Sequence, residues 1–351
     1  MNNIKKLGLS ALAGSLVAVS AQAGEMSVTG SANMTYKTKT GENAKSLGTD
    51  KDVSFTGSGE LDNGWNFTVS TLLTDAYSVS SSYTSITMGS MGTITMGADT
   101  GGASYKYDEE VPQAYEQISD AQQTSANIVG NNMDSGSIVY NSPAFDYEGA
   151  SVTFDLEYAP NASDTSSNDG GVAASSSTKG AGYGLGVTAV LAGLKGGVYG
   201  NKVEARSNGL ENTRSDPKDS FEGVTYLNYN YGPVAVGYSL SYLNAGLVSG
   251  DQVSTAVKVP RTAGGIFEGE QYSVAFNVND DLSISYTDST DTYNSASDQT
   301  TDVDQETTSY QIAYSMGAMS VKAYQMETSQ PGYDSDAKDI TVTEVALGLA
   351  F

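Results

Sequence analysis

The sequence predicts an all-β chain that crosses a membrane as an antiparallel up-and-down β-barrel of sixteen strands, with short periplasmic turns and long extracellular loops. Three observations predict this fold: strict alternation of apolar and polar residues, connections that alternate between short and long, and strand charges that lie on one face apart from Lys202, Glu268 and Glu270 at the loop rim. A closed barrel leaves no sheet edge unpaired, and so it suits an exported chain that has no cysteine for disulfides.

The first 23 residues differ in composition from the rest and are predicted to form a cleavable signal peptide. Lys5 and Lys6 make a basic start, residues 7–19 are apolar, and residues 21–23 (AQA) match a small-residue cleavage site. The apolar stretch is shorter than the roughly 20 residues of a membrane-spanning helix. We therefore expect residues 24–351 to form one barrel.

Apolar residues alternate with polar ones from one end of the mature chain to the other. At its start, Met26 and Val28 fall on one face, while Ser27 and Thr29 fall on the other. This period of two is typical of a strand with two unlike faces, and no helical period competes with it. The predicted strands lie near residues 26–37, 52–61, 65–74, 83–89, 92–98, 136–142, 150–159, 181–191, 193–203, 220–230, 233–243, 268–278, 281–288, 307–316, 318–327 and 339–351.

The connections between these strands alternate in length. Short turns are predicted at 62–64, 89–92, 143–149, 192–193, 231–233, 279–280 and 317–318. Long polar loops are predicted at 38–51, 74–82, 98–135, 159–180, 203–219, 244–267, 288–306 and 327–338. Short turns on one rim and long loops on the other are typical of outer-membrane barrels, and favour this fold over a soluble sandwich.

The strand charges give an independent check, because lipid excludes them from one face. A Lys or Arg at the bilayer midplane costs about 2–4 kcal/mol when it faces lipid. Tyrosine and tryptophan gather near predicted strand ends, which suits the two membrane interfaces. The charged residues opposite the apolar face, and hence predicted to face the lumen, are Lys37, Glu60, Asp155, Glu157, Lys195, Lys322 and Glu344.

The composition excludes several classes of function. A formal net charge of -24 disfavours binding to nucleic acid and favours cations. The absence of histidine and cysteine removes His-dependent triads and most zinc sites, so we expect no enzymatic activity. Asp155 and Glu157 share a strand face about 7 Å apart by strand geometry, but inward acids are expected in any pore.

The whole mature chain resembles the Gram-negative general porins, in particular the alphaproteobacterial group. The resemblance rests on residues 26–30 (MSVTG), 93–97 (TITMG), 136–143 (GSIVYNSP) and 345–351 (VALGLAF). The terminal Phe351 on an amphipathic strand is similar to the signal that the barrel-assembly machinery reads in that family. The resemblance implies an outer-membrane location and a homotrimer of sixteen-stranded barrels, each with its own water-filled channel.

The resemblance further implies that the third long loop, residues 98–135, folds inward and narrows the pore. A loop of this length in a compact domain indicates a function. Two features depart from the family: its proline-glutamate-phenylalanine-glycine-glycine type of loop motif is missing, and the three arginines, Arg206, Arg214 and Arg261, all lie in predicted loops. The acidic residues of the loop, which are the candidates for the constriction, are Asp99, Asp108, Glu109, Glu110, Glu116 and Asp120.

These observations predict a passive diffusion channel for small hydrophilic solutes and ions, selective for cations because carboxylates in a narrow aqueous passage concentrate cations. The alternatives are a solute-selective channel and a structural or adhesive barrel with a blocked lumen. The predicted partners are outer-membrane lipid and lipopolysaccharide. No cofactor is expected, although the acids of the predicted loop 288–306, among them Asp302, Asp304 and Glu306, are weak candidates for Ca²⁺ ligands.

Overall fold

The computed structural model describes residues 24–40, 44–75, 78–98, 102–122, 125–130, 133, 136–162, 179–205, 218–246, 264–295 and 302–351. The predicted signal peptide lies outside these residues. The strands are β1 (Glu25–Lys39), β2 (Ala44–Glu60), β3 (Asn66–Leu73), β4 (Val79–Thr87), β5 (Thr93–Ala98), β6 (Ser137–Asn141), β7 (Phe145–Tyr147), β8 (Ala150–Ala159), β9 (Lys179–Leu191), β10 (Leu194–Ala205), β11 (Ser220–Tyr231), β12 (Val234–Asn244), β13 (Gly265–Asn277), β14 (Leu282–Ser295), β15 (Val303–Met316), β16 (Met319–Ser329) and β17 (Ile340–Ala350).

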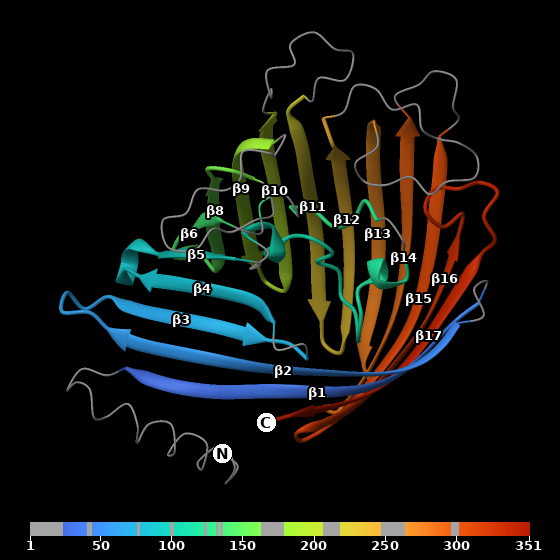
Figure 1. The fold of residues 1–351 in the computed structure, drawn as a ribbon, viewed down its shortest axis with the longest axis horizontal. Coiled ribbons are helices and arrows are strands. Elements are labelled where there is room, and N and C mark those ends of the chain that lie inside the picture. The colour runs from blue at the N-terminus through green and yellow to red at the C-terminus, as the bar shows by residue number, and fades with distance from the viewer. Residues whose placement is uncertain are drawn as a thin grey trace.

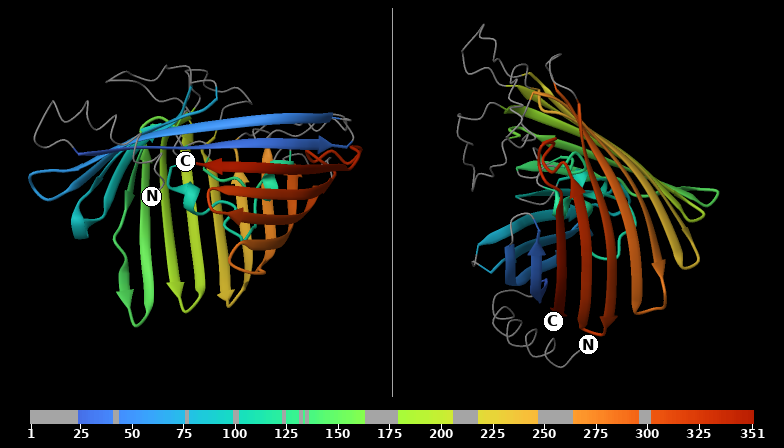
Figure 2. Two further views of the ribbon diagram at one scale, coloured as in Figure 1. Left: turned by 90° about the horizontal axis from the view of Figure 1, so that it is seen from below. Right: turned by 90° about the vertical axis from the view of Figure 1, so that its right-hand side faces the viewer.

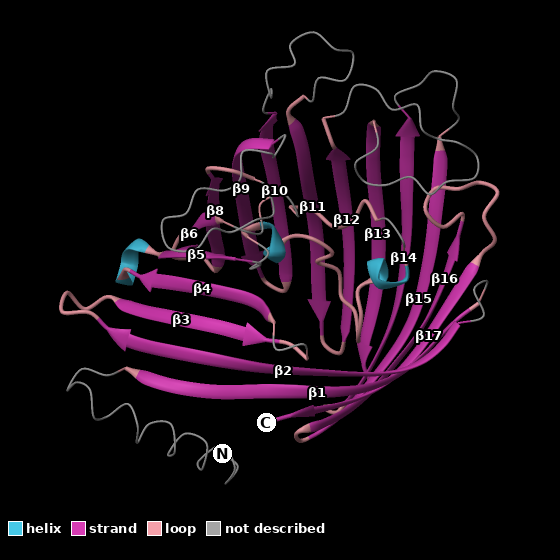
Figure 3. Cartoon of the chain, in the orientation of Figure 1, coloured by secondary structure: helices cyan, strands magenta, loops and turns pink. Residues whose placement is uncertain are grey.

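The strands form one closed antiparallel sheet in which β1 pairs with both β2 and β17 (Figures 1 and 3). At the closure, the backbone N–H groups of Gly30 and Phe351 each donate to the carbonyl of the other residue, with both N–O distances 2.9 Å. The short strands β6 and β7 both pair with β8 and occupy one position in the barrel, interrupted at Pro143. The barrel therefore has sixteen strands, as predicted.

Alternation along the strands separates an apolar outer face from a polar inner face. On β12, for example, Val236, Tyr238 and Leu240 point outward and are at least 40% exposed, whereas Ser239 points inward and is buried. The inward side of β8 to β17 is buried because a loop segment lies against it. Figure 2 shows this segment, coloured teal and green, inside the curve of the strands.

Two hairpins are longer than predicted. The structure continues β1 to Lys39 and begins β2 at Ala44, so the predicted loop 38–51 is wrong, and β14 and β15 likewise extend into the predicted loop 288–306. The outer faces of these extensions carry mostly polar residues, so the apolar alternation disappears although the backbone ladder continues. Most of the predicted short turns are found, but within the predicted turn 143–149 the structure places strand β7. At 192–193, Ala192 and Gly193 both adopt positive φ angles, 48° and 88°, which suits a two-residue hairpin turn.

Aromatic residues pair across neighbouring strands on the outer face. Toward the loop ends the ring centroids of Tyr158 and Tyr183 are 5.4 Å apart, and those of Tyr286 and Tyr310 are 5.2 Å apart. At the turn rim Tyr231 is 74% exposed. This arrangement agrees with the predicted aromatic girdles at the two membrane interfaces.

Helical structure is limited to three short 3₁₀ segments in the described residues: η1 (Gly89–Met91), η2 (Ser104–Lys106) and η3 (Ile118–Ala121). None of the helices found there has the length and apolar character needed to cross a membrane. The segments η2 and η3 belong to the long connection between β5 and β6, and they position the candidate site.

Candidate functional site: the inner loop and the barrel wall

The connection between β5 and β6 is called the inner loop here (residues 98–135), and its described residues lie inside the barrel. Its described residues contact the inner face of strands from β8 round to β17 and β1. The contacts along its middle include the N–H of Ala114, which donates to Ser285 Oγ at 2.9 Å, and the N–H of Tyr115, which donates to Gln311 Oε1 at 2.7 Å. The loop is thus fixed to the wall by polar contacts along its length.

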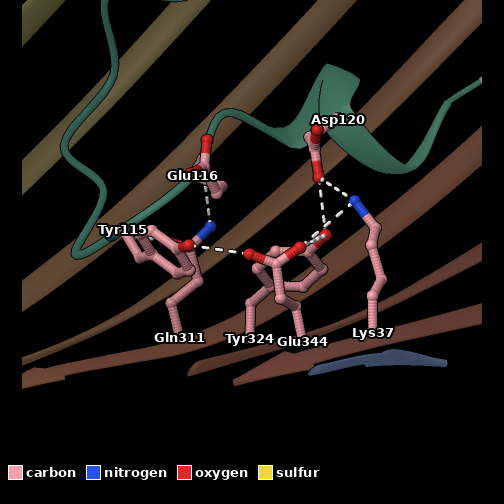
Figure 4. Close-up of polar contacts among 7 residues, drawn as sticks. All are labelled: Lys37, Tyr115, Glu116, Asp120, Gln311, Tyr324 and Glu344. Carbon is pink, nitrogen blue, oxygen red and sulfur yellow. Dashed lines mark hydrogen bonds and ion pairs between the residues drawn. The ribbon is translucent and has the colours of Figure 1, made fainter. Parts of the chain in front are cut away.

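The densest group of contacts joins η3 to β1, β16 and β17 (Figure 4). Lys37 Nζ lies 2.8 Å from Asp120 Oδ2 and 3.3 Å from Glu344 Oε2. The Tyr324 hydroxyl donates to Asp120 at 2.5 Å, and the Tyr115 hydroxyl donates to Glu344 at 2.7 Å. Lys37 therefore lies between the loop carboxylate of Asp120 and the wall carboxylate of Glu344. Burial raises the pKa of the Tyr115 hydroxyl, so this hydroxyl remains a hydrogen-bond donor.

The neighbouring residues of the loop are held by β15 and β16. Gln311 Nε2 donates to the backbone carbonyl of Glu116 at 2.6 Å, as Figure 4 also shows. Lys322 Nζ lies 5.1 Å from the centroid of the Tyr115 ring, which is cation–π distance. Burial, together with the charges of Asp120 and Glu344, raises the pKa of the Glu116 carboxyl.

The first arm of the loop docks on β8 and β10. Lys106 Nζ lies 2.8 Å from Asp155 Oδ1, and the Tyr107 hydroxyl donates to Asp155 Oδ2 at 2.5 Å. The rings of Tyr107 and Tyr199 stack with centroids 5.4 Å apart, and the Tyr199 hydroxyl donates to Glu157 at 2.8 Å. Asp155 and Glu157 thus face inward as predicted, but the loop and its tyrosines cover them.

A third ion pair between loop and wall holds the middle of the loop. Lys195 Nζ lies 2.6 Å from Glu110 Oε2 and 5.3 Å from the centroid of the Tyr226 ring. Further along, Asp291 of β14 is fully buried and accepts hydrogen bonds from Asn127 Nδ2 at 2.7 Å and from the N–H of Ala126 at 3.2 Å. The wall carboxylate of Asp291 therefore accepts hydrogen bonds from donors of the loop.

Glycines on the inner wall make room for the loop. A Cβ at Gly186 would overlap the Tyr107 ring, and one at Gly237 would overlap Pro112. A Cβ at Gly269 would overlap Asn127. Glycine within a strand commonly marks a place where another chain segment approaches closely. Gly182 and Gly186, whose added Cβ atoms would meet Met133 and Tyr107 of the loop, were therefore a signal of loop docking in the sequence.

Glu109 is packed within the loop itself. Its side chain is 4% exposed and accepts hydrogen bonds from the N–H of Ser119 at 3.2 Å and from the Ser119 hydroxyl at 2.7 Å. Burial, assisted by the nearby charges of Asp108 and Asp291, raises the pKa of Glu109 to about 7, against the hydrogen bonds from Ser119. Glu109 therefore joins two parts of the loop.

The wall formed by β1 to β5 differs from the rest in the residues that it presents inward. Lys37 faces the interior, so the odd-numbered residues of β1 share its face, and their cross-strand partners on β2 do too. Asp50 and Asp52, the partners of Asn33 and Ser31, therefore face inward. The remaining inward residues of this wall are mainly Ser and Thr, including Ser27, Thr29, Thr35, Ser54, Thr56, Ser58, Thr68, Ser70, Ser85 and Thr95.

The structure distributes the predicted constriction residues over several roles. Glu110, Glu116 and Asp120 lie at the loop–wall contacts, and Glu109 is buried within the loop. Asp108 is half-buried, and Asp99 lies outside the described residues. Sequence reasoning did not select the partners Tyr107, Tyr115, Gln311 and Tyr324, because their roles depend on where the loop docks.

No group of three or more acidic side chains in the described part of the chain could hold a metal ion. Asp304 lies on β15 and accepts a hydrogen bond from the Thr292 hydroxyl at 2.7 Å. Glu306 lies on the same strand and Asp302 directly precedes it. The weak Ca²⁺ candidates thus lie on or next to a paired strand rather than in a free loop.

Comparison with known proteins decides the family. The family model described as Gram-negative porin matches residues 8–351. The chain belongs to the Gram-negative porin family. Together with the closed barrel, this makes it an outer-membrane porin, and proteins of this family and fold are typically channels rather than enzymes. The curated proteins include no match to this sequence.

Solved structures share the porin fold at low sequence identity. A Salmonella typhi OmpF complex with daunomycin has a TM-score of 0.73 at 12% identity, covering 95% of this chain and 99% of that chain. A trimer form of OmpT, an outer-membrane protein of Vibrio cholerae, has a TM-score of 0.62 at 12% identity, covering 94% and 100%. An anion-selective porin from Comamonas acidovorans has a TM-score of 0.62 at 13% identity, covering 93% and 100%.

Proposed function

We propose that this porin is a passive diffusion channel for small hydrophilic solutes and ions that is selective for cations and narrowed by the inner loop. The observation that carries the proposal is the pairing of three interior lysines, while a further interior lysine, Lys322, contacts the Tyr115 ring. Lys37, Lys106 and Lys195 each form an ion pair with a carboxylate, whereas Asp50 and Asp52 face inward on the wall that the described loop contacts leave open. The interior charge is therefore negative where solutes pass.

The fold alone cannot set the selectivity, since a porin of the same fold is described as anion-selective. Selectivity then depends on which charges face the water. The described interior has more carboxylates than lysines, and the charges of Lys37, Lys106 and Lys195 are each balanced by a carboxylate. A narrow aqueous passage with an excess of carboxylates concentrates cations and excludes anions.

The test is a reversal potential across a planar bilayer with a KCl gradient. We expect the sign that corresponds to cation preference, and we expect the double variant Asp50→Asn with Asp52→Asn to move the potential toward zero. The matched control is Glu268→Gln with Glu270→Gln, which removes the same charge from the outer face of β13 and should leave the potential unchanged. Anion preference in the unmodified protein would overturn the proposed selectivity, and an absence of conductance would instead favour a blocked barrel.

We further propose that three chains assemble as a homotrimer through the outer face of β1 to β4. That face includes the small residues Gly57, Thr71 and Thr84 on three neighbouring strands, next to larger residues such as Phe55 and Phe67. A solved structure of the same fold is described as a trimer form. Small side chains let the sheets of two subunits approach closely. Their contact with lipid removes less apolar surface from water than the contact of leucine with lipid does.

The other partners remain proposals that rest on the sequence and the family. Lipid contacts the apolar outer face. Lipopolysaccharide lies next to the outward acids near the loop ends, such as Glu268 and Glu270, and Ca²⁺ is the bridging ion. Phe351 is proposed as the residue that the barrel-assembly machinery reads. The alphaproteobacterial grouping also remains a prediction.

A further inference from the structure

Tyr105 lies in η2 of the inner loop, and its side chain is exposed. In a 3₁₀ helix, residues three apart lie on the same side. Ser104 and Tyr107 are buried against the wall and against other loop residues. Tyr105 lies on a different side of this short helix and is 75% exposed. Its ring is therefore directed away from the wall that holds Tyr107.

The exposure of Tyr105 sets it apart from the other interior aromatic residues. Tyr107, Tyr199 and Tyr226 are at most 3% exposed and pack as one group between loop and wall. Near the extracellular end, Phe267, Tyr293 and Tyr333 form a second buried group. The other exposed aromatics of the described residues lie on outward strand faces or at the turn rim. Within the described chain, Tyr105 has no hydrogen-bond, ion-pair or ring partner.

An exposed aromatic ring on a functional loop gains no burial energy unless something binds to it. The interior also provides the open wall of β1 to β5, where hydroxyls such as those of Ser27, Thr29 and Thr56 face the water. A hydroxyl both donates and accepts a hydrogen bond. The interior therefore combines a flat apolar surface with many neutral polar groups, which suits a solute that has both kinds of surface.

We propose that Tyr105 is a specificity-determining residue that retains uncharged, ring-shaped polyhydroxylated solutes, that is, mono- and disaccharides, as they pass the inner loop. The C–H face of the sugar ring stacks on Tyr105, and its hydroxyls exchange hydrogen bonds with water and with the serine and threonine side chains of the open wall. This inference rests on the proposed channel function and names the class of solute that the channel favours.

The experiment records single-channel ion current in planar bilayers while glucose is titrated, and derives an apparent binding constant from current noise or block. Sorbitol is the matched solute, because it has similar size and hydroxyl number but no ring face. We expect glucose to bind more tightly than sorbitol to the unmodified channel. Stacking of about 0.5–1.5 kcal/mol corresponds to a loss of roughly two- to tenfold in glucose binding for Tyr105→Ala.

Two further variants identify the cause. Tyr105→Phe keeps the ring and should retain glucose binding, whereas Tyr105→Leu keeps an apolar side chain and should lose it. Equal binding of glucose and sorbitol, or glucose binding that is unchanged in Tyr105→Ala, would overturn the inference while ion conductance continued to support the channel. A channel without ion conductance would contradict the proposed function itself, so the two failures are distinguishable.

Discussion

The open wall of β1 to β5 and the covered wall of β8 to β17 obey the same alternation but differ on their inner faces. The open wall presents hydroxyls and the carboxylates of Asp50 and Asp52 to water. The covered wall presents glycines and buried acceptors such as Asp155 and Asp291 to the inner loop. The residue types on the inner face of a strand therefore depend on whether solvent or the inner loop contacts that face. Those on the outer face depend on contact with lipid or a neighbouring subunit.

The largest expected effect comes from filling a glycine position on the covered wall. Gly186→Leu places a side chain where the Tyr107 ring lies, so the first arm of the loop must leave Asp155. Such overpacking costs about 1–3 kcal/mol. We expect a higher single-channel conductance and more frequent transitions between conductance levels, both measured in planar bilayers.

The matched control is Thr29→Leu on the open wall. Thr29 is exposed on the inner face of β1. The added side chain should lower conductance slightly, because it takes up aqueous space. An equal fall in conductance for both variants would mean that the glycine does not hold the loop in place.

An intermediate effect is expected on the outer face, where the same comparison concerns subunits. Gly57→Trp adds a large ring to β2, where a Cβ meets no atom within 4 Å in the isolated chain. If this face packs against a second chain, the ring should dissociate the trimer in detergent, as measured by light scattering. Gly196→Trp on the outer face of β10 is the control and should leave the assembly intact, since lipid accommodates the ring. Loss of the trimer in both variants would point to a general effect on folding.

The smallest effect concerns the pH dependence of loop docking at Glu109. The pKa of its buried carboxyl is about 7, above the ordinary 4.5, so the docked loop binds the proton more tightly than the free loop does. This contribution to docking is fully present below pH about 4.5 and is lost as the pH rises through about 7. Hydrogen exchange of inner-loop peptides, corrected for intrinsic rate, should therefore show greater protection at pH 5 than at pH 8.

Glu109→Gln should remove this pH dependence, because the amide does not titrate in that range. Asp108→Asn is the control: it removes a neighbouring charge that raises the pKa of Glu109 but keeps the buried carboxyl, so the transition should remain with a lower midpoint. A pH-dependent protection that survives in Glu109→Gln would assign the titration to another group.

Most of the fold could be predicted from the sequence because lipid imposes a simple rule. The alternation of Val236, Tyr238 and Leu240 with polar residues fixes the strand and its face, and the charges of Lys195 and Lys322 fix the interior. The strand ends at Ser295 and Val303 were predicted less well, because the outer face there carries polar residues such as Asp304 and the apolar alternation stops.

The site could be predicted only in part. The inward phase of Asp155, Glu157 and Glu344 follows from alternation, but their partners follow from where the loop docks. Tyr107 is 48 residues from Asp155, and Tyr115 is 229 residues from Glu344, so no local pattern joins them. The glycines opposite the loop were the one local signal of docking. They indicate docking only when a second chain segment is assumed to pack against them.

The hydrogen bonds between Gly30 and Phe351 have a consequence for how the protein is made. Every other strand can pair with its predecessor during assembly, but the ring becomes complete only when the last residue reaches the first strand. Until then two rows of backbone groups have no partner, which hydrocarbon does not tolerate. Insertion and closure must therefore be coupled, and a chain shortened by a single strand would keep an open seam that invites a neighbouring chain.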